Sequence, residues 1–188
     1  MSIPLLTVWT EEFTEAPGGY PVLDGGSRRL SSVSAEPMVL KWVRLGGKHI
    51  IRLEVQGILE HRDVALRTVS AACRLPFREA KEEQFKEFRS HVVSAVGEAF
   101  NNIAIHGYRG RAAGMVEIEL AASPEQLSIE LRDYGKSYDP RNAPTPDLDS
   151  LPESGLGVFI IKSFMDSVEY TPGPPNVLKL TKWVSRSR

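Results

Sequence analysis

Apolar residues recur every three or four positions through the middle of the chain, over about residues 79–106. The repeating positions are Phe85, Phe88, Val92, Val96, Ala99 and Ile103. This spacing places one apolar stripe along one face of an α-helix, and we expect the helix to stop near Gly107. A second run near helical spacing covers residues 60–74, and residues 156–165 are apolar enough to form a third helix.

Short stretches of apolar and β-branched residues, bounded by turn-forming residues, predict strands around these helices. They are Val39–Val43, His49–Val55, Met115–Ala121, Leu127–Leu131, Val168–Tyr170 and Val177–Val184. From about Lys48 onward the predicted order is β-α-α-β-β-α-β-β. Because most strands are neighbours in sequence and the helices are grouped, we expect an α+β fold, a two-layer α/β sandwich with a mixed sheet.

The first 37 residues differ from the rest because glycine, proline and serine gather there, as in Ala16-Pro17-Gly18-Gly19. We therefore expect an irregular N-terminal extension over residues 1–37 and one domain over residues 38–188. Residues 140–154 hold four prolines and read as a long loop. A loop of this length inside a domain is usually functional.

Composition narrows the functional classes. The formal net charge of -1 gives no general attraction to nucleic acid or to an anionic membrane. Cys73 is the only cysteine, so it can form no internal disulfide, and we expect it to be a buried thiol. No apolar stretch is long enough to cross a membrane, and no signal peptide is visible. We expect a cytoplasmic protein with no direct contact to nucleic acid or membrane.

Glu98 and Asn102 lie four residues apart, which puts them on the same face of the predicted long helix, away from the apolar stripe. An asparagine oxygen is a neutral, hard ligand that suits Mg²⁺. A nearby carboxylate can accept or orient the proton of an attacking hydroxyl. The alternative is a plain polar helix face, on which such a pair is common.

Two further motifs follow at element ends. Asp133 comes at the end of a predicted strand, where a carboxylate can accept from the exocyclic amine of adenine, and Gly135 lets a flat base approach the backbone. Gly155, Leu156 and Gly157 open the third helix, whose free N–H groups favour a phosphate. Alone, these motifs also fit an ordinary turn and a flexible loop end. Together with Glu98 they suit a nucleotide with its magnesium ion.

These residues carry a resemblance to a known family. Residues 98–108 (Glu-Ala-Phe-Asn-Asn-Ile-Ala-Ile-His-Gly-Tyr) resemble the N box of the GHKL ATPases, and residues 133–140 resemble their first glycine box. Residues 154–170 resemble the second glycine box, and their Met-Asp-x-Val-Glu-Tyr ending is typical of the anti-sigma factor serine/threonine kinases. The resemblance covers about residues 48–184.

The resemblance implies a Bergerat-type ATPase fold and a role for each motif residue. The general base would be Glu98, and the magnesium ligand Asn102. Asp133, with Gly135, would read adenine. Residues 140–154 would form a nucleotide lid whose phosphate-contacting end is Gly155, Leu156 and Gly157. The implied function is a homodimeric kinase that uses ATP and Mg²⁺ to phosphorylate a small antagonist protein and that sequesters a sigma factor.

The chain also departs from the family. Lys136-Ser137 stand where a further glycine is common, and Ser154 replaces another. A threonine late in the sheet often lies near the adenine, and Thr181 and Lys179 are the candidates for its position. These departures keep open a second reading, a nucleotide-dependent protein-binding module without phosphotransfer, and a third, a nucleotide-independent scaffold.

The histidines add no competing site. His106 could approach a phosphate or could cap the helix end as a structural residue. His91 does not fit the phosphoacceptor of a histidine kinase, which lies in a separate upstream helix that this sequence does not show.

Overall fold

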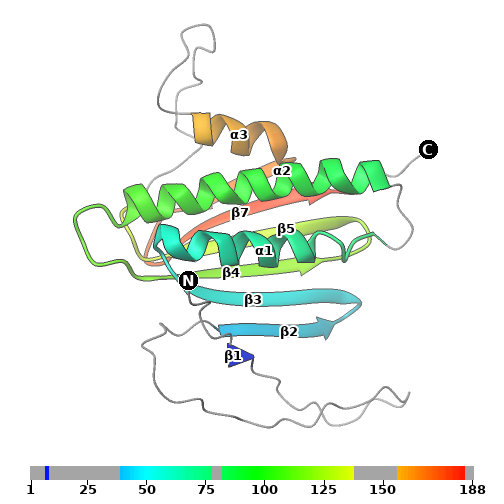
Figure 1. The fold of residues 1–188 in the computed structure, drawn as a ribbon, viewed down its shortest axis with the longest axis horizontal. Helices are drawn as coiled ribbons and strands as arrows, with labels where there is room; N and C mark the ends of the chain where they lie inside the picture. Colours follow the sequence, from blue (N-terminus) through cyan, green and yellow to red (C-terminus); the bar gives the residue numbers. More distant parts are fainter. Residues whose placement is uncertain (1–6, 9–38, 78–81, 138–155, 185–188) are drawn as a thin grey trace, which may run out of the picture.

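The computed structural model describes residues 7–8, 39–77, 82–137 and 156–184. Within these ranges seven strands form one sheet, in the order β1-β2-β3-β4-β5-β7-β6 (Figure 1). The strands are β1 (Thr7–Val8), β2 (Val39–Leu45), β3 (Lys48–Gln56), β4 (Met115–Ala122), β5 (Gln126–Asp133), β6 (Ser167–Thr171) and β7 (Asn176–Trp183). Every strand predicted from the sequence is present, with ends that differ by at most two residues.

The sheet is mixed, as predicted, because β1 pairs with β2 in parallel while all other neighbours are antiparallel. The expected irregular extension thus contributes a two-residue strand, Thr7–Val8, to the sheet edge. Residues 9–38 lie outside the described part of the chain. The proposed division between an extension and a domain at residue 38 stays a prediction.

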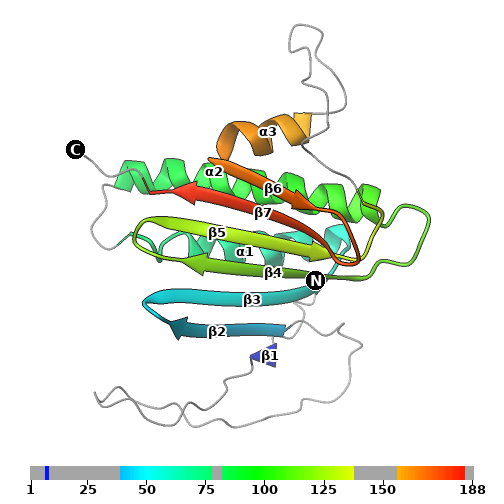
Figure 2. The same ribbon diagram turned by 180° about the vertical axis from the view of Figure 1, so that it is seen from behind.

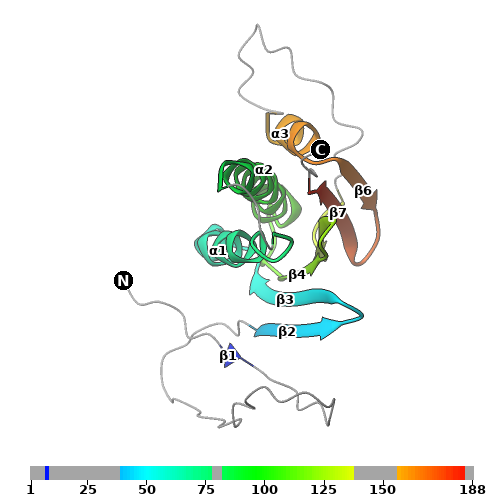
Figure 3. The same ribbon diagram turned by 90° about the vertical axis from the view of Figure 1, so that its right-hand side faces the viewer.

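The helices of the described residues all cover the same face of the sheet, so this part of the fold has two layers (Figures 1 and 3). They are α1 (Arg62–Ala72), which follows a short 3₁₀ turn η1 (Leu59–His61), then α2 (Glu82–Asn101) with its π-helical continuation η2 (Asn102–Gly107), and α3 (Leu156–Phe164). Seen from behind, the opposite face of the sheet carries no helix of the described chain (Figure 2). The predicted α+β two-layer sandwich is confirmed.

The core lies between α2 and the sheet. The predicted apolar stripe of the long helix is buried along its whole length, with no member more than 9% exposed. Strands β4 and β5 alternate strictly between buried and half-buried residues, so every second side chain points at the helices. Their buried members are Val116, Ile118, Leu120, Ala122, Leu127, Ile129 and Leu131.

The long helix ends at Gly107, as predicted, but its last turn is not α-helical. The α-helix ends at Asn101, and residues Asn102–Gly107 form a π-helical turn. Its wider ring is visible in the bond from the Tyr108 N–H to the Ile103 carbonyl, five residues back. Such π segments are frequent at functional sites, and this one starts at a candidate site residue.

Among the described residues, no helix has the length and apolar character that a membrane span requires.

Cys73 is fully buried in the core, which confirms the expected buried thiol. Burial raises the pKa of this thiol from 9.0 to about 12. The folded protein therefore holds the Cys73 proton over a pH range in which the unfolded chain has lost it.

This difference predicts a falling stability in alkali. The contribution of Cys73 to the free energy of unfolding is fully present below pH 9.0 and is lost as the pH rises toward about 12. The loss should be about 1.4 kcal/mol per pH unit within that window. Urea unfolding at several pH values, from about 8 to about 11, should show a shallower decline in Cys73→Ala than in wild type. Equal slopes in the two proteins would contradict the assignment.

Candidate nucleotide-binding site

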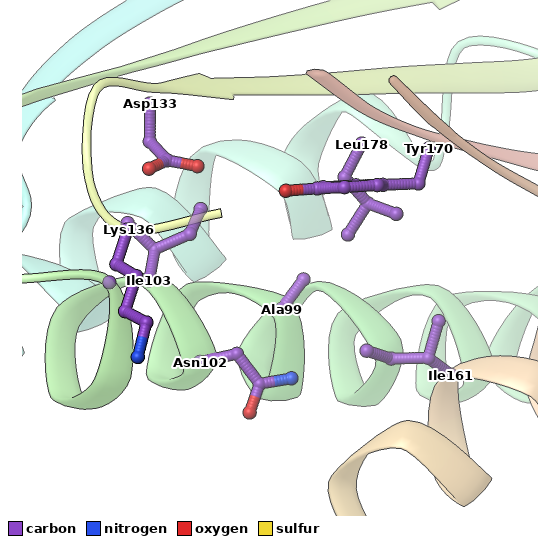
Figure 4. A pocket seen from close by; sticks show the side chains of 9 residues that line it. Ala99, Asn102, Ile103, Asp133, Lys136, Ile161, Tyr170 and Leu178 are labelled. Carbon is purple, nitrogen blue, oxygen red and sulfur yellow. The ribbon is translucent and has the colours of Figure 1, made fainter. Parts of the chain in front are cut away.

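A cleft opens between the helix layer and one end of the sheet (Figure 4). The space between its walls is about 420 Å³, part of which is open solvent. Its walls come from α2, η2, the loop after β5, α3, β6 and β7. The lining residues are Ala99, Asn102, Ile103, Gly107, Asp133, Lys136, Ile161, Tyr170 and Leu178.

Asp133 is the last residue of β5 and is only 7% exposed. One of its carboxylate oxygens, Oδ1, accepts the Gly135 N–H at 2.7 Å and the Asn176 side-chain amide at 3.1 Å. Its other oxygen, Oδ2, accepts no hydrogen bond from the described residues. The carboxylate is therefore held through one oxygen and can offer the second to a ligand in the cleft.

Gly135 is required by the close approach of two backbone segments. A side chain at this position would place its Cβ atom 2.8 Å from the Gly107 carbonyl and 2.9 Å from Asp133 Oδ1. The next residue, Lys136, donates its backbone N–H to the same Gly107 carbonyl at 2.7 Å. The loop after β5 is thus locked onto the end of the π turn, and this contact fixes the floor of the cleft.

Asn176 is a site residue that the sequence did not indicate. It is the first residue of β7, lies directly opposite Asp133 in the β5–β7 pairing, and is 1% exposed. Its amide donates to Asp133 Oδ1 and to the Gly135 carbonyl, and its oxygen accepts from the Ser137 hydroxyl at 2.9 Å. Ser137 also bonds the Tyr170 hydroxyl at 2.8 Å. Every polar group of Asn176 is used to hold the surroundings of Asp133.

The two residues suggested for the late-strand threonine lie elsewhere. Thr181 is paired with Ser128 in the middle of β7, and Lys179 lies 3.5 Å from the Glu169 carboxylate. Neither lines the cleft. The β7 residue that lies beside Asp133 is Asn176.

Tyr108 holds the residues next to Asp133 in place from the side of β4. Its ring fills the space between two glycines, because a Cβ atom at Gly57 or Gly114 would lie within 3 Å of the ring or its hydroxyl. Its hydroxyl donates to the Met115 carbonyl and accepts the Tyr134 N–H, both at 3.2 Å. Burial raises the pKa of the Tyr108 hydroxyl above its ordinary value of 10.0. Tyr108 thereby ties the residue after Asp133 to β4.

Glu98 meets the start of α3. A Cβ atom on Gly157 would lie 2.7 Å from Glu98 Oε2, so the carboxylate packs directly against the backbone at the start of α3. The first turn of α3 carries backbone N–H groups without helical partners, which favour a negative charge. Leu156, the first residue of α3, is 41% exposed. Gly155 and residues 140–154, which were expected to form the lid, lie outside the described residues.

Asn102 begins the π turn and lines the cleft with Ala99 and Ile161 (Figure 4). Asn102 thus lies on the same wall of the cleft as Ala99, the residue that follows Glu98. Of the candidate site residues, the structure places Asn102 and Asp133 in the lining of one cleft. Gly135 packs against the lining residue Gly107, and Glu98 meets Gly157.

Neither His91 nor His106 lines the cleft. His91 stacks on the Phe164 ring at 4.5 Å and so joins α2 to α3, which is a structural contact. His106 is exposed on the π turn and does not line the cleft.

Comparison with known proteins gives the class of this domain. The family model described as "Histidine kinase-like ATPase domain" matches residues 60–182. This range holds all the described candidate site residues. The chain therefore belongs to the histidine kinase-like ATPase family, and a domain of this family is an ATP-binding domain.

Within this family the chain is similar to proteins named anti-sigma F factor. One, from Clostridium beijerinckii, is 35% identical over 85 residues, which cover 42% of this chain and 57% of the relative. Another, from Oceanobacillus iheyensis, is 35% identical over 105 residues, which cover 53% of this chain and 72% of the relative. A third, from Bacillus thuringiensis, is 33% identical over 104 residues, covering 52% and 71%. These relatives confirm the resemblance to the anti-sigma factor branch of the GHKL ATPases.

Proposed function

We propose that this chain is an ATP-dependent serine/threonine protein kinase of the anti-sigma factor type. It phosphorylates a small antagonist protein and sequesters a sigma factor. The ATPase family and the relatives named anti-sigma F factor support the general class. Serine/threonine specificity, the antagonist, the sigma factor and a homodimer are parts of the proposal.

The residues of the cleft fit an adenine nucleotide. Asp133 Oδ2 would accept from the exocyclic amine of the base. The space beside Gly135 is filled by the Gly107 backbone, so Gly135 would serve by holding the loop after Asp133 in place rather than by leaving room for the base, as the sequence had suggested. The start of α3, with Gly157 and Leu156, would receive phosphate, and Gly155 would extend that contact. Asn102 would hold Mg²⁺, whose charge offsets that of the phosphates.

The contact between Glu98 and Gly157 is the observation that carries the proposal of catalysis. It places a carboxylate at the helix start where phosphate is expected, on the helix that also presents Asn102. Glu98 would accept the proton of a serine or threonine hydroxyl. The hydroxyl oxygen of the substrate would bond to the γ-phosphorus as ADP leaves. A protein that only binds nucleotide has no need of a base at this point.

The metal ligand can be tested by binding. In Asn102→Ala the binding of ATP should lose its dependence on Mg²⁺, because the neutral oxygen that would hold the ion is gone. Calorimetric titration of ATP, with Mg²⁺ and with a chelator, measures this dependence. Asn101→Ala is the matched control, since Asn101 ends α2 one position earlier and does not line the cleft. If the Mg²⁺ dependence of Asn102→Ala equals that of wild type, Asn102 is not the ligand. If wild type does not bind ATP, the proposed function is wrong.

A further inference from the structure

Lys136 is a departure from the family pattern that the proposed roles leave unexplained. It follows Gly135 in the loop after β5 and lines the cleft. Its backbone is fixed, because its N–H donates to the Gly107 carbonyl at 2.7 Å and because Gly135 packs directly against Gly107. The side chain therefore starts from a defined point at the edge of the cleft.

The side chain of Lys136 extends from this loop toward the helix. Figure 4 shows it passing Ile103 and reaching toward the helical wall that carries Asn102. In this view its ammonium group lies on the side of Asn102, away from the Asp133 carboxylate, and the residue is exposed to solvent. The Lys136 side chain is long enough to reach a ligand that extends from Asp133 to Asn102.

The charged residues that line the cleft indicate a ligand-binding role for Lys136. Asp133 and Lys136 are the two charged residues among those that line it, and Asp133 uses Oδ1 to hold Gly135 and Asn176. Some basic side chains elsewhere in the fold pair with acids, as in Arg52–Glu119 at 2.6 Å and Lys182–Asp166 at 3.1 Å. No ion pair joins Lys136 to any residue in the described ranges.

We propose that Lys136 is a phosphate-binding residue of this site, a cation that contacts the phosphates of the bound nucleoside triphosphate. The inference rests on the nucleotide site proposed above and adds a charged contact that its motif residues lack. Asn102 is neutral and Glu98 is negative, so the phosphates need a positive side chain as well as the metal. Lysine serves this purpose as a mobile point charge.

A titration series with ligands of increasing phosphate number tests the assignment. Adenosine, ADP and ATP would be titrated into wild type, Lys136→Met and Lys136→Arg at fixed Mg²⁺ and low salt. Lys136→Met should raise the Kd for ATP about tenfold, raise that for ADP less, and leave adenosine unchanged. Lys136→Arg should keep most of the ATP affinity. Added salt should weaken ATP binding more in wild type than in Lys136→Met.

Lys86→Met is the matched control. Lys86 is an exposed lysine on α2 that does not line the cleft, so its loss changes the net charge equally. Its ATP affinity should equal that of wild type. An unchanged ATP Kd in Lys136→Met, with ATP still bound by wild type, would overturn this inference and leave the proposed function standing. Equal losses for adenosine and ATP would also overturn it, because Lys136 would then only support the loop. If wild type does not bind ATP, both this inference and the proposed function are wrong.

Discussion

Glu98→Gln should lower phosphate transfer by about 10² to 10⁴ while ATP still binds with nearly the wild-type affinity. Glutamine keeps the length and hydrogen-bonding reach of the side chain but cannot take up a proton. The base acts as the hydroxyl oxygen bonds to phosphorus, so its loss raises the barrier more than it weakens the ground state. The measurement is transfer of label from ATP to a candidate antagonist protein, with calorimetry of ATP on the same samples.

Glu87→Gln provides the control for Glu98→Gln. Glu87 is an exposed acid on α2, so this change removes the same charge from the same helix without touching the cleft. Transfer by this variant should match wild type. If Glu98→Gln retains full transfer, Glu98 is not the base. If wild type transfers no phosphate to any antagonist protein while partner binding still depends on ATP, the domain is a nucleotide-dependent binding module.

The arrangement of elements could be predicted because local and global patterns agree in this chain. The stripe from Phe85 to Ile103 has helical spacing and is buried, and the alternation along β4 and β5 matches the two faces of the sheet. The π turn could not be read from the sequence. Over residues 102–107 it differs from an α-turn by a single residue per ring, which apolar spacing does not resolve.

The motif residues of the candidate site were predicted because each lies within a short, ordered pattern, but the residues that hold them were not. Asn176 follows two prolines and reads as an ordinary turn residue. Its partner Asp133 lies 43 residues away in the sequence, so the contact depends on the β5–β7 register. Ser137 looked like a missing glycine, yet its hydroxyl completes the bonds of Asn176. Such long-range satisfaction of buried polar groups is visible only once the strands are paired.

This network determines what a change at Asp133 should do. Oδ1 of Asp133 accepts two hydrogen bonds, from Gly135 and Asn176, so in Asp133→Asn the amide oxygen should take that place. The amide nitrogen would then face the cleft in place of Oδ2. The atom that faces the adenine base would then donate a hydrogen bond, whereas Oδ2 of Asp133 accepts one.

Asp133→Asn should therefore weaken ATP binding by about 10- to 100-fold, because two donors would face each other at the adenine amine. Inosine triphosphate carries an oxygen in place of that amine and should lose far less affinity, or gain some. Parallel titrations of the two nucleotides into wild type and variant give the ratio of their Kd values. General loosening of the fold would weaken both nucleotides alike, whereas a base-reading carboxylate predicts a change in the ratio. A ratio equal to that of wild type would show that Asp133 does not contact the base, even if both affinities fell.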